Sequence, residues 1–478
     1  MKRWMAVVCF VVAGFLGFTT FRAEAQLTCS PAPCVTSNVS VSSADSGTTV
    51  AGMVLAANPA SSSQDLAITA NNFLDMKYCF GSIGDSSESA VFTSSDFGLT
   101  WSGGCQLPSG PNFGPNFDPI AGYDNAGNLF SGQLGVSNSL ETAFMQKLTA
   151  GSSVWGDYFP TLQYTDPSTV KFFDYDFPGM AIDNNHTAPV LYVTAWEKGL
   201  RGLNAAPVSA VAVGQSYDGG ATWTTERVSA ILAGTDLAQY SRVAVARNSK
   251  VLATWIQTNA GNSEIVYASL SSDHGVSWTA PAKTFEILQA PQAGPQCDGN
   301  YPGVARVVPN TCVRMFYFPQ LASSFSSTGT SQFDAVYPNF NGTNVAIAYR
   351  STQNGAKWSA PIVLSGVAAD QFEPCIAAES NSSSTIGVAW LDTRNSPVGQ
   401  QDTLYDAYGV VSTDGGLTWS SAYRLSSESG GTMVETEPKS QYLGDWTGCA
   451  WANGTFYYAF PSTANGTNQV ATIVGLNP

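Results

Sequence analysis

STDGGLTW, residues 412–419, is the most complete copy of an octapeptide that recurs along this chain. In this copy Asp414 can accept hydrogen bonds from the amides of its own turn, and the glycine two residues later can take a positive φ. The octapeptide therefore predicts a tight hairpin whose tryptophan lies on the sheet. Three close copies and one degenerate copy are SSDFGLTW (94–101), SYDGGATW (216–223), SSDHGVSW (271–278) and STQNGAKW (351–358).

The spacing of the repeat indicates the architecture. With a weaker echo at 152–155 included, the tryptophans follow one another at intervals of 54, 68, 55, 80 and 61 residues. This period suits a four-stranded propeller blade with variable loops and is too long for helical repeats. The residues that define the turns are Asp96, Trp101, Asp218, Trp223, Asp273, Trp278, Trp358, Asp414 and Trp419.

The turn is identified as an Asp-box, and residues 61–478 resemble the sialidase-like (BNR repeat) β-propeller superfamily. The resemblance implies an all-β chain with a single propeller, for which we expect seven blades, with six as the alternative. In that family the box lies on the blade rim, away from the ligand channel. The resemblance therefore says more about fold than about function.

A second repeat lies between the turns, a short apolar strand opened by a polar or aromatic residue. Small residues suit the crowded propeller axis, so these segments predict the innermost strands, with their first residues at one mouth of the central channel. The last blade has no Asp-box, and we expect residues 38–42 to supply its outer strand and close the ring. The predicted inner strands are 65–68, 118–121, 177–181, 240–244, 301–305, 373–377 and 446–450.

The N-terminus predicts export. Residues 1–25 carry Lys2 and Arg3, a long apolar run and a small-residue end, which is typical of a secretory signal peptide, although an uncleaved anchor is the alternative. Residues 26–60 then form an N-terminal segment, and 61–478 the propeller. After signal cleavage we expect a secreted monomer without membrane attachment. The net charge of −15 disfavours nucleic acid as a partner.

Cysteine usage agrees with export. Eight of the nine cysteines lie after the signal, and an even count in an exported chain favours disulfides over metal or nucleophilic roles. Sequence alone leaves 105 pairings open. Our preference rests on proximity along the chain and, for the last pair, on equivalent places in neighbouring inner strands: Cys29 with Cys34, Cys79 with Cys105, Cys297 with Cys312, and Cys375 with Cys449.

Residue types restrict the chemistry. The chain has two histidines, His186 in a turn and His274 in an Asp-box, which disfavours a histidine triad or a histidine-ligated metal site. Resemblance to sialidases implies a tyrosine nucleophile, carboxylates, and three arginines on a substrate carboxylate. The Phe-Arg-Ile-Pro motif that carries the first arginine in those enzymes is absent, and no arginine lies between 26 and 200. The later candidates are Arg242, Arg306, Arg314, Arg350 and Arg394.

The openings of the inner strands give the candidate site. A mixture of carboxylates and aromatic residues there suits sugar recognition by hydrogen bonding and ring stacking, although a wet polar channel would also hold such residues. The catalytic candidates are Asp445 and Glu373 as acid/base and Tyr240 or Tyr301 as nucleophile. The ligand-binding candidates are Asp118, Asp176, Arg242, Asn300, Arg394 and Trp446.

Two functions remain open after these observations. One is a non-catalytic propeller that binds a glycan or an extracellular protein at its channel mouth; the other is a glycoside hydrolase similar to exo-α-sialidases. For Arg394, a salt bridge with Asp392 is favoured over ligand contact. We expect no cofactor and no metal, with calcium at the acidic stretches 298–300 or 402–406 as the alternative, since neither matches a complete calcium loop.

Overall fold

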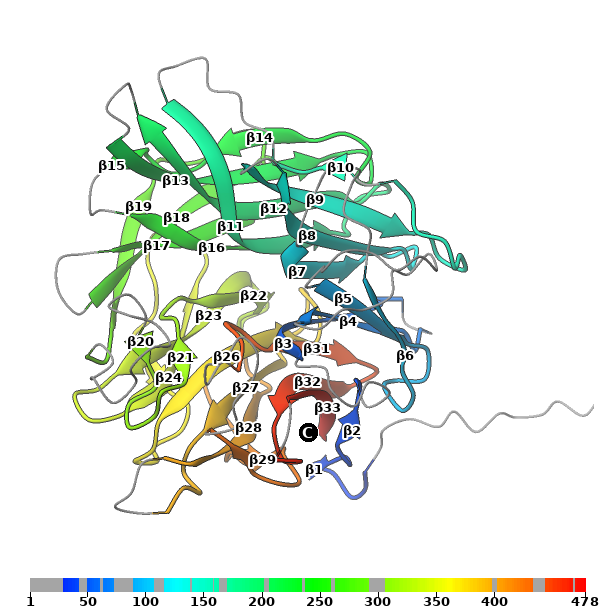
Figure 1. Cartoon of the computed structure of the whole chain (residues 1–478), viewed down its shortest axis with the longest axis vertical. Coiled ribbons are helices and arrows are strands. Elements are labelled where there is room, and N and C mark those ends of the chain that lie inside the picture. The colour runs from blue at the N-terminus through cyan, green and yellow to red at the C-terminus, as the bar shows by residue number, and fades with distance from the viewer. Residues whose placement is uncertain are drawn as a thin grey trace, which may run out of the picture.

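The computed structural model describes residues 29–42, 50–60, 63–72, 89–106, 116–137, 140–157, 159–162, 170–201, 206–233, 237–258, 263–291, 306–397, 402–432, 443–466 and 469–478. Within these ranges all regular elements are β-strands, and no helix is long and apolar enough to cross a membrane. The strands form seven antiparallel sheets that follow one another around a common axis in chain order, as the colours of Figure 1 show. We label these sheets blades A to G.

Blades A to D hold the first half of the chain, and each is a four-stranded meander from the axis outward, with one extra short strand, β15 (Leu232–Ala233), in blade C. Their strands are β3 (Val50–Ala57), β4 (Leu66–Asn72), β5 (Ser89–Ser94) and β6 (Ser102–Gln106) in A; β7 (Asn116–Tyr123), β8 (Leu129–Ser137), β9 (Leu140–Leu148) and β10 (Phe159–Pro160) in B; β11 (Val170–Asp183), β12 (Val190–Arg201), β13 (Ala206–Ser216) and β14 (Thr224–Arg227) in C; and β16 (Ala238–Val245), β17 (Val251–Thr258), β18 (Ser263–Ser271) and β19 (Ala282–Leu288) in D.

Blades E to G complete the ring, and a short hairpin, β20 (Arg306–Val307) with β21 (Arg314–Met315), precedes blade E. Their strands are β22 (Gln320–Phe325), β23 (Ser331–Phe340), β24 (Val345–Thr352) and β25 (Ile362–Val363) in E; β26 (Gln371–Ala378), β27 (Ile386–Asp392), β28 (Leu404–Ser412), β29 (Tyr423–Arg424) and β30 (Gly430–Gly431) in F; and β31 (Gly448–Ala452), β32 (Thr455–Ser462) and β33 (Val470–Asn477) in G.

The N-terminal segment closes the ring, as the sequence predicted. Strands β1 (Cys34–Val35) and β2 (Val39–Ser40) both pair antiparallel with β33, where Val39 lies opposite Ile473. The last blade thus takes its outer strands from the start of the chain, and the edge of β33 is covered. In Figure 1 these blue strands lie beside the red C-terminal ones.

Two predicted disulfides are confirmed. Cys29 is bonded to Cys34, and Cys375 of β26 is bonded to Cys449 of β31, which links the inner strands of blades F and G. Cys312 is also disulfide-bonded. The side chains of Cys79, Cys105 and Cys297 lie outside the described part of the structure.

The recurrent octapeptides form the turns between the third and fourth strands of blades A, C, D, E and F. In the copy in blade C, Asp218 accepts hydrogen bonds from the amides of Ala221 and Thr222, at 3.0 and 2.9 Å, and from the Thr222 hydroxyl at 2.6 Å. Trp223 Nε1 donates to the Gly220 carbonyl at 3.0 Å. Asp96, Asp273 and Asp414 accept the corresponding bonds from the residue four positions later, and in the degenerate copy Asn354 takes this place.

The predicted inner strand of blade A is wrong by one strand. Residues 65–68 belong largely to β4, the second strand, whereas β3 (Val50–Ala57) lies on the axis. Residues 301–305 lie outside the described ranges, and the inner strand of their blade is β22. The inner strands of blades B, C, D and F lie where the sequence placed them, and β31 begins two residues after the predicted start.

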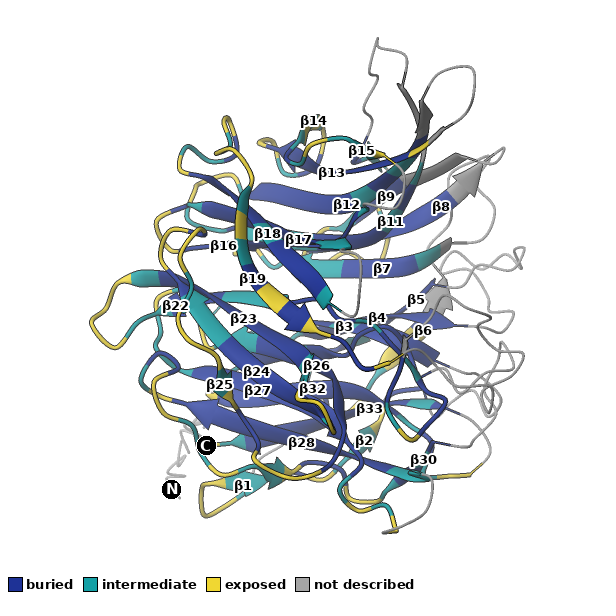
Figure 2. Cartoon of the chain, turned by 90° about the vertical axis from the view of Figure 1, so that its left-hand side faces the viewer, coloured by how far each residue is buried: buried dark blue, intermediate teal, exposed yellow. Residues whose placement is uncertain are grey.

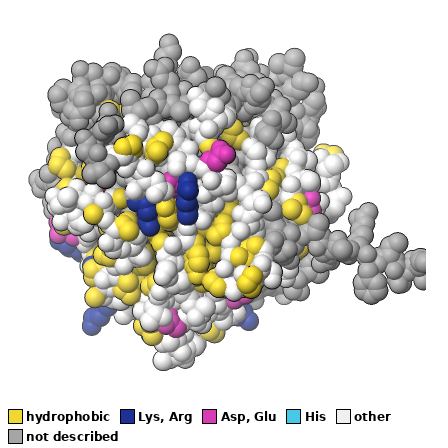
Figure 3. Space-filling view, turned by 90° about the horizontal axis from the view of Figure 1, so that it is seen from below, with side chains coloured by type: hydrophobic (Ala, Val, Ile, Leu, Met, Phe, Trp, Pro, Cys, Tyr) yellow, Lys and Arg dark blue, Asp and Glu magenta, His cyan; other side chains and the backbone are white. Residues whose placement is uncertain are grey.

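The strands are mostly buried between neighbouring blades, and the exposed residues concentrate in the turns (Figure 2). Charged side chains are few over the described surface seen in Figure 3, in keeping with a chain in which 12% of residues are charged. The fold is therefore held by apolar packing between sheets, with polar groups reserved for the turns and the channel.

Candidate functional site

A β-bulge of the same form opens five inner strands at one mouth of the channel. The pairing register breaks at Ala51/Val54, Phe117/Ile120, Asp176/Gly179, Gln239/Arg242 and Phe372/Cys375. In each bulge the first residue has a positive φ, between 47° and 59°, which is uncommon for residues other than glycine. These residues are Gly52, Asp118, Phe177, Tyr240 and Glu373.

The bulge equivalence refines the predicted ring of side chains. The residue of blade C that matches Asp118 is Phe177, whereas the predicted Asp176 lies one position earlier. A bulge redirects side chains relative to a regular strand, and a backbone conformation that costs about 1 kcal/mol or more for a non-glycine residue persists where the surroundings enforce it. Four such residues at one mouth mark this end of the channel as the candidate site.

Two aspartates pair at this mouth. The carboxyl groups of Asp118 and Asp176 lie within hydrogen-bonding distance, and Asp118 also contacts Asn71, whose Oδ1 accepts from the Asp118 amide at 2.8 Å. Burial raises the pKa of Asp118 well above its ordinary value, and the charges of Asp176 and Asp445 raise it further. Burial and these charges therefore favour the protonated form of Asp118, whose carboxyl group can donate a hydrogen bond to Asp176.

Lysine supplies the countercharge to the exposed side of this pair. Lys198 Nζ lies 2.9 Å from Asp176 and 2.7 Å from Asp174, and 4.7 Å from the ring centre of Trp196. The side chains of Lys198 and Asp176 are 29% and 19% exposed, whereas Asp118 is 7% exposed. Solvent thus reaches the pair through Asp176 and Lys198.

The segment before blade E carries an arginine across the channel mouth. Arg314 of β21 donates to both oxygens of Asp445, with Nε to Oδ1 at 3.0 Å and Nη2 to Oδ2 at 2.6 Å, and Asp445 precedes the inner strand of blade G. The Arg314 guanidinium also lies 5.0 Å from the ring centre of Phe316. This ion pair ties the insertion between blades D and E to the far side of the ring.

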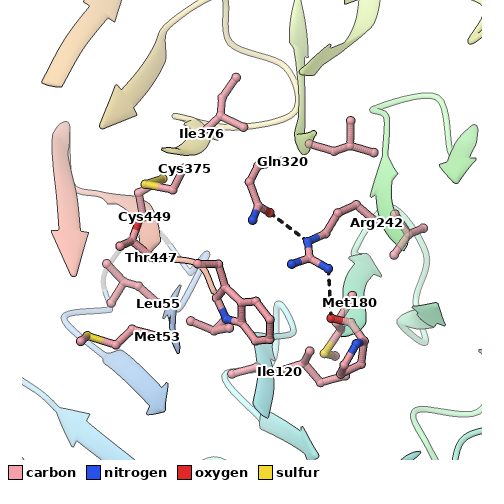
Figure 4. Close-up of a pocket in the computed structure, with 18 residues that line it drawn as sticks. Met53, Leu55, Ile120, Met180, Arg242, Gln320, Cys375, Ile376, Thr447 and Cys449 are labelled. Atoms are coloured by element: carbon pink, nitrogen blue, oxygen red, sulfur yellow. Dashed lines mark hydrogen bonds between the residues drawn. A yellow bond between two sulfur atoms is a disulfide. The ribbon is translucent and has the colours of Figure 1, made fainter. Parts of the chain in front are cut away.

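Arg242 closes the channel just below this mouth. Its guanidinium lies 4.6 Å from the ring centre of Phe318 and 5.2 Å from that of Trp446. Nε donates to Gln320 at 2.9 Å, as Figure 4 shows. Nη1 donates to the Ser241 carbonyl at 2.8 Å. Burial lowers the pKa of Arg242 to about 10, so it stays charged at neutral pH.

An enclosed part of the channel lies beneath Arg242. Its volume is about 220 Å³, and the Cys375–Cys449 disulfide, Met53 and Ile120 are among the groups that line it (Figure 4). A second, wider cavity of about 1040 Å³ opens at the other ends of the inner strands, lined by Asn184 and Trp451 among others. The charged groups described above therefore belong to one mouth only.

Two of the predicted catalytic residues, Glu373 and Tyr240, have largely buried side chains. Glu373 is 5% exposed, and its two carboxylate oxygens have no hydrogen-bond partner among the described residues. Burial, and then the charge of Asp445, raise the pKa of Glu373 well above its usual range. Burial likewise raises the pKa of Tyr240, whose ring packs edge-on against Phe177 with centroids 4.4 Å apart. Burial thus favours the neutral form of both side chains, which works against a phenolate nucleophile.

The predicted site residues fall into three groups: those at this mouth, one within blade F, and two outside the described residues. Asp118, Asp176, Tyr240, Arg242, Glu373, Asp445 and Trp446 gather at this mouth, and together with Arg314 we call them the mouth cluster. Arg394 instead donates to Asp392, with Nε to Oδ1 at 2.9 Å, and stacks on Tyr408 within blade F, which agrees with the favoured structural interpretation. Asn300 and Tyr301 lie outside the described residues, as do 298–300 of the calcium alternative.

Three contributors were missed by sequence reasoning. Lys198 and Trp196 extend from β12, and Phe316 comes from the insertion; all three are partly exposed near Tyr240 or Asp176. The pattern Trp-Glu-Lys at 196–198, directly after an apolar strand, was the available signal. Glu197 of this pattern pairs with Arg227 at 2.8 Å.

Comparisons with known proteins gave matches among solved structures alone. No family model matches the chain, and no curated protein matches it. Similar solved structures include the Hadza microbial sialidase Hz136 (10% identity, 95% of this chain and 98% of that chain, TM-score 0.45), an α-L-arabinofuranosidase from Fusarium graminearum (12%, 92% and 97%, 0.43) and the NanB sialidase from Streptococcus pneumoniae (9%, 92% and 97%, 0.43).

At these identities the similarities concern the fold alone and assign no residue. The seven sheets, their order around the axis and the closure of blade G by the N-terminal strands are properties of this chain's own pairings. In fold, the chain is a seven-bladed β-propeller.

Proposed function

We propose that the mouth cluster binds a glycan and that the protein acts in an extracytoplasmic compartment. The observation that carries the proposal is the mixed rim of the mouth, where Asp176, Lys198 and Arg314 reach solvent beside the half-buried rings of Trp196 and Phe316. Carboxylates and cations bind sugar hydroxyls, and aromatic rings pack against sugar faces. The disulfides support the compartment, since such bonds persist in oxidising environments.

Charge at the mouth favours a neutral glycan over a sialylated one. Arg314 is engaged bidentately by Asp445, and Arg242 is buried and donates to Gln320 and to backbone carbonyls. Neither arginine therefore presents a free guanidinium edge to a substrate carboxylate. Among the side chains that the structure describes, these two are the arginines of the mouth, whereas a sialidase needs three.

Glycoside hydrolysis is the second candidate, and the partly exposed carboxylate of Asp176 supports it. Glycosidases place their two carboxyl groups about 5–10 Å apart, so Asp118, which is hydrogen-bonded to Asp176, would orient Asp176 rather than act as the second group. The exposed Asp176 would then be the group that meets a substrate, with Asp118 and Lys198 holding its orientation. Asp445 is bound to Arg314 and Glu373 is sealed from solvent, so these two support the site rather than act as acid and base.

A binding measurement on matched variants tests the proposal. We expect isothermal titration against neutral oligosaccharides to show binding by the wild-type protein and a loss of at least tenfold in Asp176→Asn. Asp174→Asn is the control, because Asp174 also pairs with Lys198 but has no bond to Asp118. Equal binding by wild type and Asp176→Asn, or binding only to sialylated glycans, would refute the proposal.

Hydrolysis is measured separately, with a panel of aryl glycosides. Turnover by the wild-type protein that disappears in Asp176→Asn, and persists in Asp174→Asn, would establish the second candidate. Glycan binding without turnover of any glycoside would leave a non-catalytic binding propeller.

A further inference from the structure

The two histidines of the chain meet where a turn of blade C lies against a turn of blade D, although 88 residues separate them. His186 lies in the turn after β11, and His274 lies in the octapeptide turn after β18. His186 Nε2 is 3.0 Å from His274 Nδ1 and 3.2 Å from Asp183 Oδ2. The three ligand-type atoms all lie within 4.8 Å of one another.

Hydrogen bonding alone does not satisfy this cluster. Asp183 is fully buried, and its Oδ2 has no well-oriented hydrogen-bond partner, while His186 Nε2 faces two acceptors and carries at most one proton. A buried carboxylate oxygen without a partner carries a desolvation cost of about 1–3 kcal/mol. A cation at the common point of the three atoms would satisfy all of them at once.

We infer that Asp183, His186 and His274 form a binding site for a divalent transition-metal ion of the zinc type. A tetrahedral zinc ion with bonds of about 2.0–2.1 Å holds neighbouring ligand atoms about 3.3 Å apart, close to the 3.0 and 3.2 Å found here. Two imidazoles and one carboxylate select zinc and its neighbours in the transition series over calcium or magnesium, which require oxygen ligands.

The ligands are held by further contacts, as metal ligands usually are. Asp183 Oδ1 accepts from the amide and the side chain of Asn185, at 3.0 and 2.6 Å. The backbone carbonyl of His274 accepts from Tyr192 and Tyr217, both at 2.9 Å. Aspartate and one tyrosine come from blade C strands and His274 from blade D, so a bound ion would clamp the two blades together.

The backbone conformation of His274 is one that glycine also adopts in this turn. Its φ is 61°, and the equivalent positions are glycines in blades C and F, Gly219 and Gly415, with φ of 71° and 72°, and Phe97 in blade A, with φ of 55°. Histidine in this conformation costs roughly 1 kcal/mol relative to glycine. His274→Gly should therefore leave the fold intact, because glycine fits this turn at least as well as histidine.

The test uses untagged protein that has been dialysed against EDTA. We expect the wild type to bind one equivalent of Zn²⁺ in a competition titration with a chromophoric chelator, and Zn²⁺ to raise its melting temperature by several degrees. His274→Gly and the exposed-turn variant His186→Asn should each bind at least tenfold more weakly and show no such rise. Near-UV circular dichroism and the metal-free melting temperature of His274→Gly establish that it is folded.

Cobalt gives an independent readout of the ligand set. Co²⁺ should produce d–d absorption bands in the wild type that are lost in both histidine variants. Absence of stoichiometric Zn²⁺ binding by the wild type, or binding by His274→Gly with unchanged affinity, would overturn the inference. The glycan measurements at the opposite mouth are unaffected by either result.

Discussion

Arg314 and Asp445 form a bidentate ion pair across the channel mouth, although 131 residues separate them in the chain. The arginine comes from the short hairpin between blades D and E, and the aspartate from the segment that leads into blade G. Their side chains are 21% and 6% exposed, so the pair is largely withdrawn from water. It fixes the insertion over Arg242 and Tyr240 and thereby shapes the mouth.

Removing one partner of this pair should destabilise the protein. Asp445→Asn leaves the Arg314 charge partly buried without its counterion, and we expect a loss of about 2–3 kcal/mol in the free energy of unfolding, measured by urea denaturation at pH 7. Arg314→Met should cost a similar amount. The double variant should cost less than the two single variants together, by about 1–2 kcal/mol. Strictly additive effects would show that the two groups do not interact.

Asp118 offers a test of its protonation state. Because its folded pKa lies above the unfolded one, its contribution to stability is complete at low pH and is lost as pH rises through the folded pKa. Asp118→Asn mimics the protonated form, retains donors for Asp176, and suits the φ of 53°. We expect its melting temperature to match the wild type near pH 4, where Asp118 is protonated in both the folded and unfolded states, and to exceed it at pH 9.

Asp118→Ala is the matched comparison at the same position. It removes the contacts with Asn71 and Asp176 and places a non-polar residue in a left-handed conformation, which should cost about 2–3 kcal/mol at both pH values. If Asn and Ala are equally destabilising at pH 9, the carboxyl group is ionised in the folded protein and the assignment of the shared proton is wrong.

Asp370 provides a pH effect away from the mouth. Burial raises its pKa to about 7, although the Val345 amide, at 2.7 Å, opposes the shift. The folded state therefore holds this proton more tightly than the unfolded state, and the stabilisation is full below about pH 4 and is lost as pH rises towards 7. Asp370→Asn should gain up to about 4 kcal/mol relative to the wild type between pH 4 and pH 8.

The pH effect is obtained from the difference between the two unfolding curves, because other groups titrate in both proteins. Asp157→Asn, at an exposed position, is the control and should leave the pH dependence unchanged. A constant difference between wild type and Asp370→Asn across this range would mean that Asp370 titrates normally.

The sequence predicted those features that depend on local contacts. The octapeptide turns were readable because the Asp218 carboxylate bonds to amides three and four residues away, so the pattern survives in the sequence. The inner strand β3 was missed, since nothing local distinguishes Val50–Ala57 from the equally apolar 65–68; their order is set by packing around the axis. Likewise, the place of Arg314 follows from the path of the insertion, which residue types alone do not determine.

The candidate site could likewise be predicted where it depends on a repeated local pattern, and not where it depends on the packing of one turn against another. The candidates at the strand openings were found because the inner strands repeat. Asp118, Tyr240 and Glu373 each occupy the same position in a bulge of the same form. The contact between His186 and His274 depends on how blade C packs on blade D, and the sequence of neither turn indicates it. This contact could not be predicted from one sequence, whereas the Cys375–Cys449 link between blades F and G could, because the two cysteines occupy equivalent places in repeated inner strands.

The Cys375–Cys449 disulfide should contribute more to stability than Cys29–Cys34. The bonded residues are 74 and 5 positions apart, and the chain-entropy description gives about 4 and about 2 kcal/mol for loops of these lengths. Replacing both cysteines of a pair with serine avoids a free thiol, and urea denaturation of the two double variants measures the difference. We expect the Cys375/Cys449 variant to be the less stable by about 2 kcal/mol. The reverse order would mean that Cys29–Cys34 holds the closing strand β1 on β33, so that ring closure by the N-terminal segment, rather than the link between blades F and G, limits the stability of the propeller.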